Sequence, residues 1–170
     1  MHIIAIYRLV SQAMKSELGA AFTFELATAG RKMRKLFDRY VRERGLTLPR
    51  ARALLLLAQE RSWNQTELAD ALEIEHPSVV RLLDGLERQG LITRSAVAGD
   101  RRAKQIELTI AAQAQVRDLE ELTERLRTTL LQGIDAASLA VALSTLQRVV
   151  ANAEQAAAMR REEEANVGHG

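Results

Sequence analysis

The sequence has no cysteine at all, and a chain of 170 residues contains only two prolines and 4% aromatic residues. The absence of cysteine excludes a disulfide framework and excludes thiol-based redox sensing by this chain. The only histidines are His2, His76 and His169, so a zinc site built from cysteine and histidine is also excluded. No spacing of carboxylates suggests another metal site. We therefore expect neither a metal nor a cofactor.

Patterns typical of enzymes and of membrane proteins are missing as well. The chain has no cysteine nucleophile, no glycine-rich phosphate loop and no pairing of histidine with carboxylates. The apolar run Leu54–Leu57 is far too short to span a bilayer. Arg8 interrupts the apolar patch Ile3–Ile6, and no cleavage-like region follows it. We expect a cytoplasmic protein that is not an enzyme and has no membrane partner.

The sequence is rich in helix-favouring residues, and its charge is unevenly distributed. Apolar residues make up 47% of the chain, and many of them are alanine and leucine, which favours helix over sheet. The formal net charge is only +2, but residues 31–44 are strongly basic and residues 107–124 lean acidic. The basic segment has two interpretations: a surface close to DNA phosphates, or a solvated helix face rich in arginine.

Two short helices joined by a tight turn are expected between Asn64 and Gly90. Asn64 can cap the first helix, and Glu67 lies where a capping box needs an acidic residue. The second helix should begin near Glu75, because Pro77 fits a first helical turn, and Gly90 should end it. The apolar residues at helical spacing are Leu68, Ala71 and Leu72, then Val79, Leu82, Leu83 and Leu86.

The polar face of the second helix indicates a possible contact with DNA. A helix fits the major groove of B-DNA, where its N-terminal residues meet base edges. Arg81 can make a paired contact with guanine, and Ser78 can reach a base or a phosphate. The alternative is an ordinary solvated helix face. The candidate DNA contacts on this helix pair are Thr66, His76, Pro77, Ser78, Val80 and Arg81.

A β-hairpin with a cationic tip is expected directly after these helices. Its strands are residues 91–95 and 103–108, and the turn over residues 97–102 carries glycine, aspartate and two arginines. An arginine at such a tip can enter a narrow A·T-rich minor groove, and Asp100 can hold Arg102 by a charge-assisted hydrogen bond. The alternative is a hairpin whose charges only protect an edge strand from aggregation. The candidate DNA contacts here are Arg94, Asp100, Arg101, Arg102 and Lys104.

Residues 46–109 resemble the winged helix-turn-helix core of MarR-type transcription regulators, a group that includes the SlyA-like proteins. The most specific element is the Asp100-Arg101-Arg102 run followed by Leu108-Thr109, since many families share a helix-turn-helix. The other matching segments are 45–48 (GLTL), 65–69 (QTELA), 77–84 (PSVVRLLD), 86–87 (LE) and 90–92 (GLI). The chain departs from the family in opening its recognition helix with Glu75 and His76, where a small polar cap and a basic residue are common. We therefore expect an unusual half-site.

Long helices are expected on both sides of the winged region, which makes the fold mainly α with a small β-hairpin wing. The expected helices cover residues 1–18, 20–44, 48–60, 109–133 and 136–164. Residues 1–18 either extend a dimer interface or are loosely ordered. Trp63, in the connector before the winged unit, is interpreted as a buried anchor under the wing.

The flanking helices carry more apolar surface than one small winged domain can bury. A two-fold homodimer is therefore expected, and a monomer whose helices cover one another is the alternative. The resemblance implies the same dimer, built from the first and the last two helices. The expected organisation is N-terminal dimerisation helices (1–45), a winged helix-turn-helix region (46–109), C-terminal dimerisation helices (110–165) and a disordered tail (166–170).

The function that follows is sequence-specific regulation of transcription, usually repression, by a homodimer bound to a pseudo-palindromic site in double-stranded DNA. The resemblance implies a ligand pocket and a small aromatic or phenolic effector. Arg31, Arg34 or Arg39 can pair with a ligand carboxylate or a phosphate, or stay solvated. Two alternatives remain open: an architectural DNA-binding protein of low specificity, and a winged module that has lost DNA binding and contacts proteins.

Overall fold

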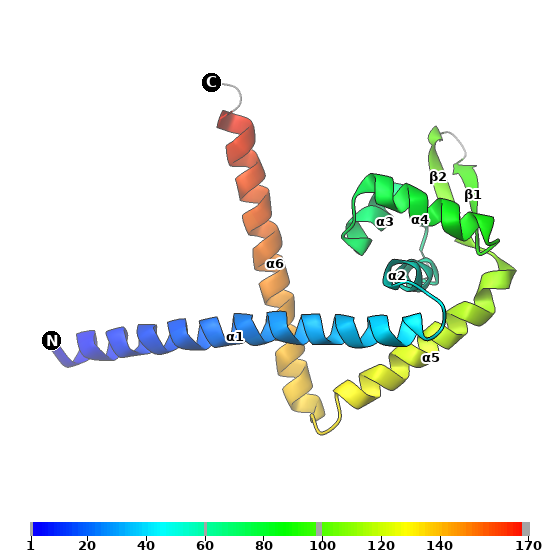
Figure 1. Ribbon diagram of the computed structural model, residues 1–170. Coiled ribbons are helices and arrows are strands. Elements are labelled where there is room, and N and C mark those ends of the chain that lie inside the picture. Colours follow the sequence, from blue (N-terminus) through cyan, green and yellow to red (C-terminus); the bar gives the residue numbers. More distant parts are fainter. Residues whose placement is uncertain (1, 60, 98–99, 168–170) are drawn as a thin grey trace. The chain divides into compact units, whose positions relative to one another are not determined.

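The computed structural model describes the backbone of residues 2–59, 61–97 and 100–167, and the side chains of residues 15–59, 61–95 and 105–164. The fold is mainly helical with a two-stranded antiparallel sheet, so the expected fold class is confirmed (Figure 1). Its elements are α1 (His2–Arg42), α2 (Leu48–Leu57), α3 (Gln65–Leu72), α4 (His76–Arg88), β1 (Ile92–Val97), β2 (Asp100–Leu108), the 3-10 helix η1 (Ile110–Ala112), α5 (Gln113–Leu130) and α6 (Ala136–Val167). The chain forms two compact units, Met1–Leu126 and Arg127–Gly170.

The core of the first unit lies where α2, α3, α4 and the hairpin meet the end of α1 and the first part of α5. Leu54 of α2, Leu68 of α3 and Leu83 of α4 are fully buried. Val41 of α1 and Leu119 of α5 are buried in the same cluster. Burying each large aliphatic side chain of this kind contributes about 1.5–3 kcal/mol, because apolar surface leaves water. This core holds α4 and the hairpin against α2.

Helix α1 is one continuous helix, whereas the sequence suggested two helices that meet near residue 19. Gly19 and Gly30 lie inside it, with open space where a Cβ atom would be. A glycine inside a helix weakens it by about 1 kcal/mol relative to alanine, but it does not end the helix. Gly45 follows the end of α1 with a φ of +70°, a conformation that glycine adopts without strain.

Local sequence determines the start of α3 and both ends of α4. Glu67 N donates to Asn64 Oδ1 and Asn64 N donates to Glu67 Oε2, both at 2.9 Å, so the expected capping box is confirmed. Helix α4 begins after Glu75 and is followed by Gly90 at φ +69°, as expected. Glu73, which the sequence pattern did not indicate, ends α3 in a left-handed conformation with φ 57°.

The hairpin is longer than the sequence indicated. β1 pairs antiparallel with β2 from Ile92↔Leu108 to Ala96↔Lys104, and an irregularity then brings Val97 opposite Asp100. The charged residues assigned to the turn therefore belong to strand β2. Aspartate has low strand propensity, and the pairing of Asp100 with Val97 of β1 overrides that preference.

Trp63 is buried against the hairpin, which confirms its interpretation as an anchor. Its side chain is 4% exposed, and its carbonyl accepts a hydrogen bond from Ile106 N of β2 at 3.2 Å. The guanidinium of Arg61 lies 3.4 Å from the centre of the indole ring, a cation–π arrangement.

After the hairpin, the chain forms a 3-10 turn and then α5, where the sequence suggested one helix over 109–133. In the second unit, α6 begins after Asp135, whose carboxylate accepts hydrogen bonds from Ser138 N at 2.9 Å and from Ser138 Oγ at 2.6 Å. Helix α6 includes residues 166 and 167 of the tail expected to be disordered, and residues 168–170 lie outside the described residues. Within the described part of the chain, none of the helices has the length and apolar character to cross a membrane.

Candidate nucleic-acid interface

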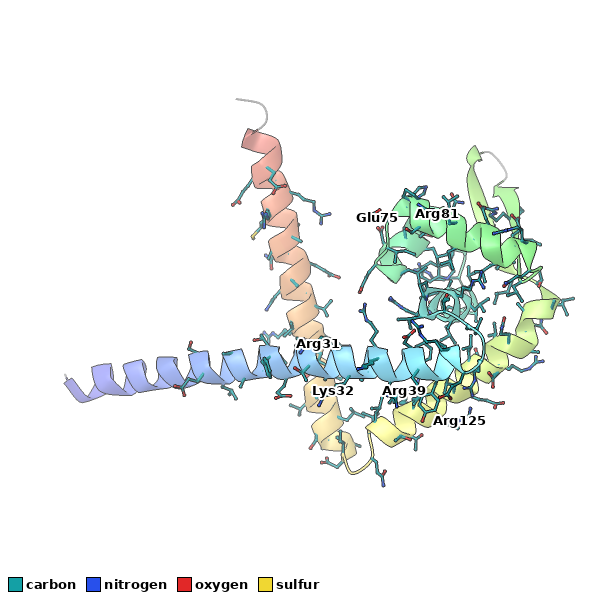
Figure 2. The ribbon with its side chains drawn as sticks, viewed as in Figure 1. Arg31, Lys32, Arg39, Glu75, Arg81 and Arg125 are labelled. Atoms are coloured by element: carbon teal, nitrogen blue, oxygen red, sulfur yellow. The ribbon has the colours of Figure 1, made fainter. Side chains whose placement is uncertain are left out.

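Helix α4 presents a polar face to solvent because its apolar stripe lies in the core. Val79, Leu83 and Leu86 are fully buried. Four candidate contacts on this helix are exposed, namely His76, Pro77, Ser78 and Arg81. The fifth, Val80, is half-buried. Figure 2 shows Arg81, together with Glu75, on the side of α4 that faces away from α2. The structure therefore brings these predicted residues together on the first turns of one exposed helix. Thr66 is exposed on α3.

Glu75 is the N-cap of α4, and it caps the helix through its backbone carbonyl alone. Its carbonyl accepts hydrogen bonds from Ser78 N at 2.9 Å and Val79 N at 3.1 Å, while its carboxylate makes no capping hydrogen bond. The Glu75 side chain is exposed. A carboxylate at this position can accept a hydrogen bond from the amino group of cytosine, but it repels phosphate.

Arg94 connects the hairpin to α4. Its Nη2 lies 2.7 Å from Asp84 Oδ1, and its Nε donates to Glu87 Oε2 at 3.0 Å, while Nη2 also contacts Glu87. The hydrogen bonds that Arg94 donates to Glu87 raise the pKa of Arg94 above its ordinary value, although partial burial acts in the opposite direction. With only 15% of its side chain exposed, this predicted DNA contact has both carboxylates of α4 as its partners.

The remaining candidates lie on strand β2 of the hairpin. Asp100, Arg101, Arg102 and Lys104 all belong to β2, where Lys104 is paired with Ala96. Their side chains lie outside the described residues. The backbone therefore places these predicted contacts on the hairpin next to α4.

Three arginines outside the predicted site support the helix-turn-helix. Arg52 of α2 donates to the carbonyls of Leu72 and Ala71 at 3.0 Å each, which satisfies the C-terminal end of α3. Arg50 of α2 lies against α4: a Cβ atom added at Gly85 would be 3.2 Å from its Nη2. Arg34 of α1 pairs with Glu73 at 3.3 Å.

No sequence signal indicated these contacts, because each joins residues that are far apart in the chain. Arginine on a short helix also has an ordinary interpretation as a solvated residue. Among the described residues, no group of three histidine, cysteine, aspartate or glutamate side chains is placed to hold a metal ion.

Comparison with known proteins assigns the chain to a family. The sequence model of the MarR family matches residues 46–104. The crystal structure of the transcriptional regulator PA3341 superimposes with a TM-score of 0.74 at 41% identity, over 79% of this chain and 98% of that chain. The chain belongs to the MarR family. The resemblance seen in the sequence is therefore confirmed, and the α3–α4 pair with its hairpin is the winged helix-turn-helix of a MarR-family transcriptional regulator.

Other solved MarR-type structures share the fold. A MarR-family transcriptional regulator from Silicibacter pomeroyi matches with a TM-score of 0.64 at 25% identity, over 71% of this chain and 82% of that chain. MepR from S. aureus, solved as a complex with DNA, matches with a TM-score of 0.66 at 23% identity, over 77% of this chain and 96% of that chain.

Proposed function

We propose that this MarR-family protein is a sequence-specific DNA-binding regulator, a ligand-responsive repressor that binds a pseudo-palindromic operator as a homodimer. The observation that carries the proposal is that the first two turns of α4 expose polar side chains, while the apolar stripe of the same helix is buried in the core. The fold is also that of MepR, which has been solved with DNA.

Helix α4 is the element that enters the major groove in this proposal. The side chains that meet base edges are Ser78 and Arg81, since both are exposed on its first two turns. Arg81 reads guanine through two parallel hydrogen bonds, and Ser78 contacts a base or a phosphate. His76 and Thr66 lie at the edge of this surface and position the protein on the DNA backbone.

The hairpin acts as the wing. Its arginines lie on β2 and enter the minor groove beside the half-site, where a narrow A·T-rich segment concentrates negative potential. Arg102 is the inserted residue, and Asp100, Arg101 and Lys104 flank it. Arg94 contributes indirectly, because its bonds to α4 set the direction of the wing.

Apolar side chains that are exposed in the single chain support the proposed homodimer. On α1, Phe24 is 65% exposed and Leu18 is 72% exposed. On α6, Val141 is 67% exposed and Val150 is 56% exposed. A second copy of the chain can bury both sets around a two-fold axis, which presents two copies of α4 to successive major grooves.

The test is selection of bound sequences from a random duplex pool, followed by affinity measurements at two salt concentrations. Enrichment of a pseudo-palindrome with half-site centres about 10 bp apart, and a steep loss of affinity with added salt, supports the proposal. Salt-sensitive binding without an enriched motif supports the alternative, an architectural DNA-binding protein. The described polar groups at the start of α4 favour the first outcome, because architectural binders rely on phosphates and DNA deformability.

A further inference from the structure

The turn between α3 and α4 is closed without a glycine. It consists of Glu73, Ile74 and Glu75. Glu73 N donates to Asp70 O at 3.1 Å. Ile74 N donates to Ala69 O at 3.2 Å, which completes a Schellman motif. The left-handed residue of this motif is usually glycine, but here it is Glu73, with a φ of 57°. Its Cβ atom makes the conformation costly, and its carboxylate lies at the negative end of the α3 dipole.

Arg52 of α2 supports this turn from outside. A helix leaves its last four carbonyls without partners, and the Schellman motif of α3 satisfies two of them. The other two belong to Ala71 and Leu72. Arg52 donates from Nη2 to Ala71 O and from Nη1 to Leu72 O, at 3.0 Å each. A single guanidinium therefore completes the end of α3, and its positive charge is favourable at the negative end of the helix dipole.

Arg52 is held in place by a helix that belongs to the core. Its neighbours Ala51, Ala53 and Leu54 are fully buried. Arg52 itself is half-buried, so its two hydrogen bonds are partly shielded from water. The described residues give it no carboxylate partner, which leaves the carbonyls of α3 as its partners. Hydrogen bonds from a charged donor are stronger than those between neutral groups. The contact therefore fixes the end of α3 to α2.

A second arginine reaches the same turn but makes a weaker contact. Arg34 of α1 pairs with Glu73, with 3.3 Å between Nη2 and Oε2, and the two side chains are 60% and 65% exposed. Exposed ion pairs contribute little, because water and salt screen them. Arg34 also binds only the side chain of Glu73, whereas Arg52 binds the backbone that leads into it. Arg52 is therefore the contact that constrains the path of the chain into α4.

The path of the chain through this turn affects the residues that read DNA in the proposed function. Only three residues separate Leu72 from the start of α4 at His76. Ser78 and Arg81 are exposed on the first two turns of that helix. A paired contact with guanine needs both of its hydrogen bonds aligned, and functional side chains must be held within about 0.5 Å of their working geometry. A small displacement at the end of α3 is therefore enough to weaken such a contact.

We propose that Arg52 is a positioning residue for DNA reading. By binding the carbonyls of Ala71 and Leu72 it fixes the α3–α4 turn, and it thereby sets the angle at which α4 presents Ser78 and Arg81. It does not touch DNA itself. This inference rests on the proposed function for its DNA readout, and the effect on the turn is measured without DNA.

The first experiment follows amide hydrogen exchange by NMR in the full-length protein and in Arg52→Lys. Lysine keeps the charge, but a single ammonium group lacks the planar pair of donors that binds two carbonyls. Exchange at Glu73 and Ile74 should become about ten-fold faster, because the turn opens more easily. Leu86, which is buried in the second half of α4, reports on the stability of the whole fold and should change less. An acceleration at the turn that does not exceed the one at Leu86 overturns the proposal.

The second experiment measures affinity for the selected DNA site and for an unrelated duplex, at two salt concentrations and at a temperature where circular dichroism shows every variant folded. In Arg52→Lys and Arg52→Gln, the ratio of specific to non-specific affinity should fall about ten-fold, as expected when a paired base contact is misaligned. Arg34→Ala is the matched control and should change the ratio by less than about two-fold.

Salt dependence separates positioning from direct contact. Arg52→Gln removes the charge, and it should keep the salt dependence of the parent protein because Arg52 meets no phosphate. A salt slope reduced by about one, with an unchanged ratio, would make Arg52 a phosphate contact and overturn the proposal. If the parent protein prefers no sequence, the proposed function fails, and hydrogen exchange still decides whether Arg52 holds the turn.

A second-site change tests the route through the turn. Glu73→Gly should restore much of the specificity that Arg52→Lys loses, because glycine adopts the left-handed conformation without strain and closes the turn with less support. Glu73→Gln removes the same charge and the same partner of Arg34 but keeps the Cβ atom, so it should not restore specificity. Equal recovery with glutamine, or no recovery with glycine, overturns the proposal.

Discussion

Arg94 of β1 and Asp84 of α4 form an ion pair with 2.7 Å between Nη2 and Oδ1, and Glu87, one helical turn further along α4, binds the same guanidinium. The pair is formed between residues of the hairpin and of the helix that presents Ser78 and Arg81. A single arginine therefore pairs with two carboxylates on α4 and joins the start of the hairpin to that helix. We predict that the direction of the wing depends on this contact.

Replacing Arg94 with alanine should destabilise the protein and weaken DNA binding together. The change leaves Asp84 and Glu87 without their shared cation, and losing hydrogen bonds to charged groups costs about 1–3 kcal/mol. Urea unfolding followed by the fluorescence of Trp63, which lies against the hairpin, measures the loss. Arg88→Ala is the matched control: Arg88 is exposed on α4 and, among the described residues, donates only to the carbonyl of Asp84, so its loss should be small. Equal losses in the two variants would argue against a connecting role for Arg94.

Arg81→Ala should reduce affinity by about 1–3 kcal/mol and relax sequence preference at one base pair in each half-site. The expected reason is the loss of the proposed two-bond contact with guanine, because Arg81 is an exposed side chain of α4. Competition binding against a panel of single-base variants of the selected site measures both effects. A uniform loss across all sequences would instead mean that Arg81 contacts phosphate.

Arg102→Ala should weaken binding most when the half-site is flanked by A·T-rich sequence. An arginine in the minor groove responds to groove width, which is narrow in A-tracts. Affinities for two duplexes with the same half-sites, one with A·T flanks and one with G·C flanks, measure the difference. Arg81→Ala serves as the comparison, because its loss should not depend on the flanks. The same loss on both duplexes would show that Arg102 does not read the minor groove.

Features set by neighbouring residues could be predicted from the sequence. Asn64 and Glu67 are three positions apart, so their capping box can be read directly, and the buried stripe of α4 follows from helical spacing. These local patterns also gave the exposed candidates Ser78 and Arg81. They carry enough information because a helix places residues three and four apart on one face.

Features set by distant residues could not be predicted in the same way. Arg34 and Glu73 are 39 positions apart, and nothing near either residue indicates the other. Glu73 also adopts a left-handed conformation where glycine is the usual signal, so the end of α3 had no local marker. For Arg94 the residue was identified correctly as part of the hairpin, but its partners on α4 depend on how the hairpin folds back on the helix.

Glu75→Ser should change the bases preferred next to the recognition helix. The Glu75 carboxylate makes no capping hydrogen bond, so it is available to accept from cytosine, while serine removes the charge and provides a better cap. Repeating the random-pool selection with the variant measures the change in preference, and thermal unfolding measures the change in stability. An unchanged preference with a gain of about 0.5–1 kcal/mol in stability would make Glu75 a structural residue only.

The beginning of α6 should depend on pH through Asp135. The hydrogen bonds from Ser138 lower the pKa of Asp135 below its ordinary value, with the side-chain bond as the largest cause. Because the folded pKa lies below the unfolded one, the stabilising contribution is complete above the unfolded value of about 4. It is lost as pH falls through the folded pKa. Asp135→Asn keeps a capping side chain and removes this dependence.

The pKa itself can be measured by following the Asp135 carboxyl carbon by NMR between pH 7 and pH 2. Ser138→Ala removes the hydroxyl donor and keeps the backbone donor, so it should raise the pKa of Asp135 partway toward its ordinary value. The amides of the first turn of α6 should then begin to shift at a higher pH than in the parent protein. An identical titration in the two proteins would mean that the Ser138 hydroxyl does not bond to the carboxylate in solution, and that the backbone N–H alone caps the helix.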